Sequence, residues 1–337
     1  MAGGPPPWVP SLASLHLMKL RFEPAQWAAL LGQAGLTRIE LQMCGFDEPP
    51  RNISRLANLR SLHINSSCYF THSPWRHLDG LSRLTELRLE SCGVTNLPCG
   101  LSTLTALRRL HVSDEPISAG WERLGGLRQL TALVLNRIRC DELPRCIGQL
   151  TSLRMLGLFA NWHVLDWGAL LPLTCVEELD LGFCYSLTEL PAALSRMPRL
   201  RFLELMYCTN LAGGWQHLAG CSQLTALSLT GCIRLAGLPA ELATLPALQV
   251  LYLDSSSTYA GFRHLAHLAC LTHIGMLYRS MDPASDRRLQ GSAADLAQDA
   301  AAAQDLAARG VLRVRQRGRM LSPHAHQGQP ADGIMQK

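Results

Sequence analysis

The stretch LTELRLESCGVTNLP, from Leu84 to Pro98, spaces its apolar residues in a way that decides the fold. When Leu84 is counted as position one, leucines occupy positions one, four and six, and a cysteine occupies position nine. The same frame returns in LTALSLTGCIRLAGLP, from Leu224 to Pro239. Two explanations are open at this point: chemistry built around the cysteine, or a spacing set by packing.

The frame repeats along most of the chain, in steps of 23 to 25 residues. Position one is Leu12, Leu36, Leu59, Leu84, Leu107, Leu130, Leu153, Val176, Leu200, Leu224, Leu248 and Leu271. Because side chains alternate along a strand, the residues at positions four and six face the same side. One short strand cannot bury that side alone, so each unit has to stack on its neighbours.

The pattern L-x-x-L-x-L-x-x-N/C-x-L resembles the leucine-rich repeat family, over twelve units from Leu12 to Met276. The resemblance implies an α/β repeat solenoid: a horseshoe with one parallel strand per unit in a concave β-sheet. Units with a proline alternate with units that carry an aromatic residue, so that the full period is about 47 residues. The prolines are Pro50, Pro98, Pro144, Pro191 and Pro239, and the aromatics are Trp27, Trp75, Trp121, Trp167, Trp215 and Phe262. The Leu-Pro units resemble the intracellular type, including that of plants and green algae.

The domain organisation follows from the ends of the array. We expect an uncapped or truncated segment at residues 1–11 and the solenoid at residues 12–280. The helix-forming residues between Ala284 and Gly310, followed by VLRVR, predict a helical C-terminal cap with a last edge strand over residues 281–315. The polar, Gly- and Pro-bearing residues 316–337 predict a disordered tail.

The residue at position nine points inward in the family, in a ladder that satisfies backbone carbonyl groups. The predicted ladder consists of Cys44, Cys92, Asn161, Cys184, Cys208 and Cys232. No C-x-x-C pair is present, and cysteines one unit apart do not form a tetrahedral quartet. We therefore interpret the cysteines as packing residues and predict no metal.

Composition and motifs exclude several classes of function. The net charge of +5 is too small and too dispersed for a nucleic-acid binder, and no apolar run is long enough to span a membrane. No secretory signal begins the chain, so we expect a cytoplasmic protein with reduced thiols. No phosphate-binding loop, nucleophile elbow or catalytic carboxylate pair is present, so we expect no cofactor and no enzymatic activity. We also expect the protein to be a monomer.

Specificity should reside at positions three, five, seven and eight, which packing does not constrain. In the middle units these positions hold apolar side chains beside acids: Met155, Phe159, Glu178, Asp180, Phe183, Phe202, Glu204, Met206 and Tyr207. Trp162 and Tyr185 follow position nine and would flank them. These side chains form either an exposed patch for a partner or a set that packs on itself, and the two interpretations stay open. The acids favour a basic partner segment and disfavour nucleic acid there.

The leading hypothesis is a non-catalytic protein–protein interaction scaffold that binds its partner on the concave face. One alternative is the substrate-receptor arm of a ubiquitin ligase or the sensor arm of an immune receptor. Another is an adaptor associated with the cytoskeleton or the ciliary axoneme, which the resemblance alone suggests.

Overall fold

The chain winds into an open coil in which every described strand joins one sheet. The computed structural model describes residues 12–20, 35–44, 51–65, 78–235, 237–254, 260–277 and 293–315. Thirteen described strands form a parallel sheet in sequence order. They are β1 (Ser14–Met18), β2 (Arg38–Gln42), β3 (Ser61–Asn65), β4 (Glu86–Glu90), β5 (Arg109–Ser113), β6 (Ala132–Asn136), β7 (Met155–Gly157), β8 (Glu178–Asp180), β9 (Phe202–Glu204), β10 (Ala226–Ser228), β11 (Val250–Asp254), β12 (His273–Leu277) and β13 (Leu312–Arg315).

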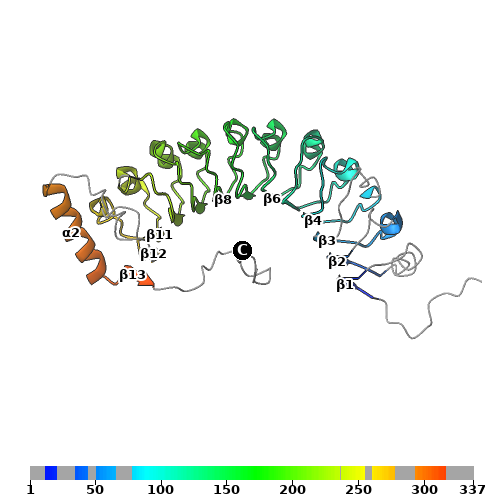
Figure 1. The fold of residues 1–337 in the computed structure, drawn as a ribbon, viewed down its shortest axis with the longest axis horizontal. Helices are drawn as coiled ribbons and strands as arrows, with labels where there is room; N and C mark the ends of the chain where they lie inside the picture. Colours follow the sequence, from blue (N-terminus) through cyan, green and yellow to red (C-terminus); the bar gives the residue numbers. More distant parts are fainter. Residues whose placement is uncertain are drawn as a thin grey trace, which may run out of the picture.

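The register follows the leucine frame, because position four of each unit pairs with position four of the next. Leu179 pairs with Leu203, and Leu203 pairs with Leu227. Figure 1 shows the result as an arc with the strands on its inner side. Strands are held about 4.8 Å apart by their hydrogen bonds, whereas the outer segments are bulkier, so the stack curves toward the strands. The predicted horseshoe is confirmed.

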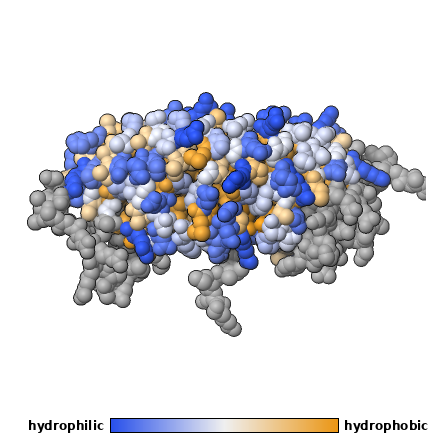
Figure 2. All heavy atoms as spheres, turned by 90° about the horizontal axis from the view of Figure 1, so that it is seen from above, coloured by the Kyte–Doolittle hydropathy of each residue, from blue (hydrophilic) through white to orange (hydrophobic). Residues whose placement is uncertain are grey.

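Short 3₁₀ helices form the outer side of the arc in Figure 1. They are η1 (Arg51–Arg55), η3 (Cys99–Thr103), η4 (Trp121–Gly126), η5 (Arg145–Gln149), η6 (Gly168–Leu170), η7 (Ala192–Arg196), η8 (Trp215–Gly220), η9 (Ala240–Thr244) and η10 (Phe262–His264). On the convex face in Figure 2, hydrophilic residues cover most of the surface, and hydrophobic ones reach it mainly in the middle of the array.

In seven of the nine described 3₁₀ helices, the alternation of proline and aromatic units corresponds to two ways of beginning the helix. Pro98, Pro144, Pro191 and Pro239 are the residues that precede η3, η5, η7 and η9. The helices η4, η8 and η10 instead follow a glycine in the left-handed conformation and begin on the aromatic residue. At Gly214 a Cβ atom would lie 2.4 Å from the backbone nitrogen of Leu190, so only glycine fits against the preceding Leu-Pro unit. Pro50, Trp27 and Trp75 lie outside the described residues.

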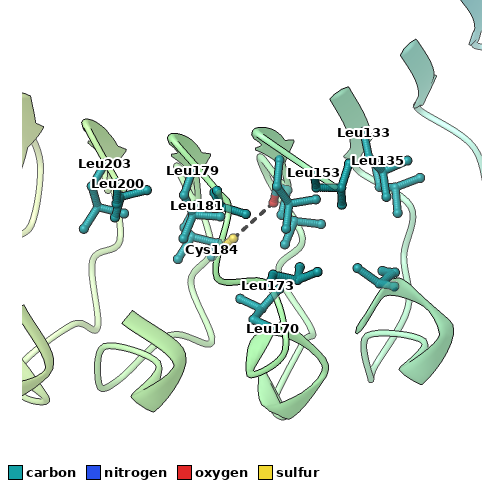
Figure 3. Packing of buried hydrophobic residues seen from close by; sticks show 14 of the residues in the cluster. Leu133, Leu135, Leu153, Leu170, Leu173, Leu179, Leu181, Cys184, Leu200 and Leu203 are labelled. Atoms are coloured by element: carbon teal, nitrogen blue, oxygen red, sulfur yellow. Dashed lines mark hydrogen bonds between the residues drawn. The ribbon is translucent and has the colours of Figure 1, made fainter. Parts of the chain in front are cut away.

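The core is a continuous layer of leucines between the strands and the outer helices. Figure 3 shows Leu179 and Leu181 of one unit packing beside Leu200 and Leu203 of the next. All four are fully buried. Fully burying a leucine stabilises the fold by about 1.5–3 kcal/mol, and each unit contributes several.

The six side chains of the predicted ladder lie beneath the strands. The thiols of Cys44, Cys92, Cys184, Cys208 and Cys232 lie 3.1–3.5 Å from the carbonyl oxygen at position six of the preceding unit. Figure 3 draws one of these contacts, from Cys184. In the ladder, Asn161 donates its Nδ2 to the oxygen of Leu135 and accepts the N–H of Ile138 at its Oδ1.

Glu115 also occupies position nine, although it is not one of the six predicted ladder residues. It is fully buried, and its carboxylate accepts the N–H groups of Cys92 at 2.5 Å and Val94 at 2.6 Å. Burial raises the pKa of Glu115 to about 7, and these hydrogen bonds oppose the rise. Its position nine in the frame is the signal that would have placed it inside the molecule.

We expect the buried thiols to resist alkylation in the folded protein. Burial raises the pKa of Cys184 to about 12, whereas Cys99 and Cys270 are exposed. Because the thiolate is the reactive form, iodoacetamide at pH 8 should label Cys184 at least ~100-fold more slowly than Cys99. Mass spectrometry of peptides after timed labelling measures both rates, and labelling in urea is the control. Equal rates in the folded protein would contradict this packing.

The C-terminal end of the array is covered by helix α2 (Ala293–Ala308), which packs against η10. Asp299 of α2 is buried and accepts the N–H of Gly261 at 2.7 Å and the N–H of Arg263 at 3.1 Å. Strand β13 then pairs with β12. The predicted segments at residues 1–11, 281–292 and 316–337 lie outside the described residues.

Candidate functional site

The concave face presents the side chains at positions three, five and seven of each strand. Its N-terminal half carries a network of charges that pair with one another. Glu86 lies 2.9 Å from Nε of Arg88 and 3.4 Å from Nε2 of His63. The hydrogen bond from His63 lowers the pKa of Glu86 to about 2, with Arg88 adding to the shift, although burial opposes it. These groups therefore satisfy one another across β3 and β4.

His111 continues the network in an uncharged form. Its Nε2 lies 3.4 Å from the Glu90 carboxylate and 2.6 Å from the hydroxyl of Ser113. Burial lowers the pKa of His111 to about 4, with Arg88 adding to the shift, and burial raises the pKa of Glu90. We conclude that His111 is a neutral imidazole at neutral pH, so it adds no positive charge to the face beside Glu90.

A hollow of about 620 Å³ lies in the middle of the concave face, lined from Glu86 on β4 to Phe202 on β9. Four of the predicted site residues line it: Met155, Glu178, Asp180 and Phe202. Within β7 to β10 the charged residues are Glu178, Asp180 and Glu204, and all three are acidic. The face thus changes from mixed charge over β2–β5 to acidic charge over β8 and β9.

Glu204 is half-buried, as Glu178 and Asp180 are. Its carboxylate accepts the N–H of Met206 at 2.9 Å. Burial raises the pKa of Glu204 to about 7, and the neighbouring Asp180 carboxylate adds to the rise, whereas hydrogen bonds from Ser228 and Met206 oppose it. Asp180 accepts the N–H of Gly182 in the same way, at 2.9 Å. Both carboxylates therefore also hold the turn that follows their own strand.

The remaining predicted aromatics form a second cluster where the strands end. We call Phe159, Trp162, Phe183, Tyr185 and Tyr207 the ring cluster. The ring centroid of Phe183 lies 5.0 Å from that of Phe159, 4.7 Å from that of Tyr207 and 6.2 Å from that of Tyr185. Tyr185 in turn stacks on Trp162 at 6.4 Å. The cluster thus runs from the concave face around the edge of the sheet.

The ring cluster combines the two interpretations that the sequence left open. Phe159, Phe183 and Tyr207 pack on one another and are only half-buried. Tyr185 and Trp162 are 38% and 42% exposed. Phe183, Tyr185 and Tyr207 line an open hollow of about 610 Å³ with Thr209. The rings are therefore rigidly placed by their mutual contacts and still accessible on one side.

Position eight does not continue the strand, so alternation along the strand does not describe the direction of its side chain. It has a positive φ in nine described units: Lys19, Met43, Ser91, Asp114, Arg137, Ala160, Phe183, Tyr207 and Gly231. The conformation costs on the order of 1 kcal/mol for a residue other than glycine. This conformation directs the N–H group of position eight toward the carbonyl oxygen at position seven of the next unit. The N–H of Tyr207 thus donates to the carbonyl oxygen of Thr230 at 2.6 Å. Phe183 and Tyr207 thereby project at the edge of the sheet.

Gly231 makes room for the last ring of the cluster. A Cβ atom there would lie 2.6 Å from Cδ1 of Tyr207, so any other residue would displace the ring. The Tyr207 ring therefore lies flat against the backbone of the next unit. Glycine is also the residue that best tolerates the left-handed conformation of this position.

Solved structures with a similar fold identify this architecture. The crystal structure of an internalin (inlF) from Listeria monocytogenes str. 4b F2365 aligns with 83% of this chain and 86% of its own, at 17% identity and a TM-score of 0.58. The fold is a leucine-rich repeat horseshoe. An internalin C2 (inlC2) structure from the same organism aligns with 59% of this chain and 82% of its own, at 23% identity and a TM-score of 0.48. No protein-family model matches the sequence. No curated protein matches it either.

Two further observations concern the described part of this leucine-rich repeat horseshoe. It contains no group of three or more His, Cys, Asp or Glu side chains placed to hold a metal ion. None of its helices has the length and apolar character needed to cross a lipid bilayer.

Proposed function

We propose that this leucine-rich repeat horseshoe is a non-catalytic scaffold that binds a basic protein segment along β7 to β10. The observation that carries the proposal is the half-exposed ring cluster beside Asp180 and Glu204. Clustered aromatics on a rigid frame bind proteins well because they bury large areas and lose little side-chain entropy. Most of the cluster is already held by ring-to-ring contacts, so little ordering cost remains for binding.

The acids give the proposed partner its charge. Acidic side chains on β8 and β9 would attract a basic segment and guide its approach, and their main effect would be on the association rate. A nucleic acid would be repelled there by its phosphates. An arm of a ubiquitin ligase or immune receptor, or a ciliary adaptor, would use a surface of this kind, and none of the described side chains favours one of them over a general scaffold.

The test is a double substitution, Phe183→Asn with Tyr207→Asn. Asparagine accepts the left-handed conformation of position eight better than alanine does, so the change removes the rings without adding backbone strain. A peptide selected on the wild-type protein from a random display library should bind this variant at least ~30-fold more weakly, the loss of about 2 kcal/mol typical of a hot spot. Biolayer interferometry measures the two dissociation constants.

Met43→Asn is the matched control, because Met43 occupies the same position in a distant unit, with φ 53°, and is 55% exposed. Its affinity for the peptide should equal that of the wild type. The double variant should lose only the ring contacts in stability, about 0.5–1.5 kcal/mol per pair. Unchanged peptide affinity in the double variant would contradict the proposal.

A further inference from the structure

The hollow at the edge of the sheet is lined mainly by three aromatic rings. Phe183 and Tyr207 are tilted by 36° to each other, and Phe183 meets Tyr185 at 63°. Thr209 is the remaining lining residue. Because the face of an aromatic ring carries negative charge density, such a hollow attracts a cation with a flat, weakly hydrated surface.

The chain already holds one cation against this cluster. The guanidinium carbon of Arg137 lies 5.5 Å from the centroid of the Phe159 ring. The same guanidinium places its Nη1 3.1 Å from Oδ1 of Asp114. One arginine is therefore held by a ring face and a carboxylate together. The contact occupies the outer end of the ring cluster, next to Phe183.

Two carboxylates, those of Asp180 and Glu204, lie on the concave face beside the ring cluster. A methyl group at Gly182 would lie 3.2 Å from Oδ1 of Asp180 and 3.2 Å from Cδ2 of Phe159, so acid and ring meet at this glycine. Glu204 accepts the N–H of Met206, the residue before Tyr207. Rings and carboxylates thus recur together two and three units beyond that of Arg137.

We propose that the hollow formed by Phe183, Tyr185 and Tyr207 binds an arginine side chain of the partner, with the guanidinium against the rings and with Asp180 and Glu204 of the adjoining concave face adding to the attraction for a cation. This inference rests on the proposed function, since it names the chemistry of the residue that the scaffold recognises. Arginine fits better than lysine because its guanidinium is planar, stacks on rings and donates several hydrogen bonds in one plane. The ammonium of lysine is more strongly hydrated and makes a point contact.

The experiment uses the full chain with 3-fluorotyrosine in place of its 6 tyrosines and follows their ¹⁹F resonances. The probes are acetyl-Gly-Arg-Gly-amide, its lysine counterpart and its citrulline counterpart, which keeps the shape of arginine without the charge. The arginine peptide should shift the resonances of Tyr185 and Tyr207 in a saturable way, with Tyr252 unchanged. The lysine and citrulline peptides should bind at least ~5-fold more weakly. Substituting each tyrosine by phenylalanine assigns its resonance.

Phe183→Asn should abolish the arginine-dependent shift of Tyr185, and Met43→Asn should leave it unchanged. Equal shifts with all three peptides, or no saturable shift at Tyr185 and Tyr207, would overturn the inference. Display selection separates this result from the proposed function. Selected peptides that need Phe183 and Tyr207 but lack arginine would overturn only the arginine site. A selection that yields no peptide dependent on these rings would overturn the proposed function.

Discussion

Leu203→Ala should lower the free energy of unfolding by about 2–5 kcal/mol, the range measured for buried leucines in other proteins. Leu203 is fully buried at position four of β9, between Leu179 and Leu227 on the neighbouring strands. Removing its side chain opens a cavity that the stacked units cannot close, because both neighbours are fixed by hydrogen bonds. Urea unfolding followed by circular dichroism measures the loss.

Leu15→Ala is the matched control for that substitution. Leu15 holds position four of β1, which pairs with β2 on one side, and it is 8% exposed. In a linear array each unit is stabilised through its neighbours, so a unit at the end shares fewer contacts. We expect Leu15→Ala to cost less than half as much as Leu203→Ala. Equal losses would mean that the array does not behave as a chain of stacked units.

Asp299→Ala should detach the C-terminal helix from the array. The carboxylate is 4% exposed, accepts two backbone N–H groups and lies 3.9 Å from Nη1 of Arg263. Alanine would leave the N–H groups of Gly261 and Arg263 without this acceptor, and each buried unsatisfied donor costs about 1–3 kcal/mol. Hydrogen exchange in α2 and β13 should therefore rise sharply, while that of β5–β9 stays at the wild-type level. Mass spectrometry of deuterated peptides measures both regions.

Asp305→Ala is the control on the same helix. Asp305 is exposed and pairs with Arg309 at 3.4 Å, four residues along the helix. An exposed pair of this kind contributes about 0.3–0.5 kcal/mol, so exchange in α2 should change little. If Asp305→Ala loosened α2 as much as Asp299→Ala, the helix would be sensitive to any change, and the buried carboxylate would not be its anchor.

The candidate site was predicted in part. The frame placed Met155, Glu178 and Phe202 on neighbouring strands, because position three is the same in every unit. Phe183 and Tyr207 were predicted at position eight of the same surface, and the spacing alone does not reveal that this position has a positive φ and projects at the edge of the sheet. The leucine frame did not identify Glu115 as a buried residue. A carboxylate is not expected inside the molecule unless it has partners, and its two backbone N–H donors become evident only in the structure.

The spacing of leucines by itself determined the horseshoe, the parallel register and the inward direction of positions four and six, because these depend only on local alternation and on stacking of identical units. The tertiary structure alone decided how the aromatic side chains are exposed. The exposure of Phe183 and Tyr207 depends on the turn after each strand, on Gly231 in the next unit and on the rings of adjacent units. These groups come into contact only when neighbouring units stack.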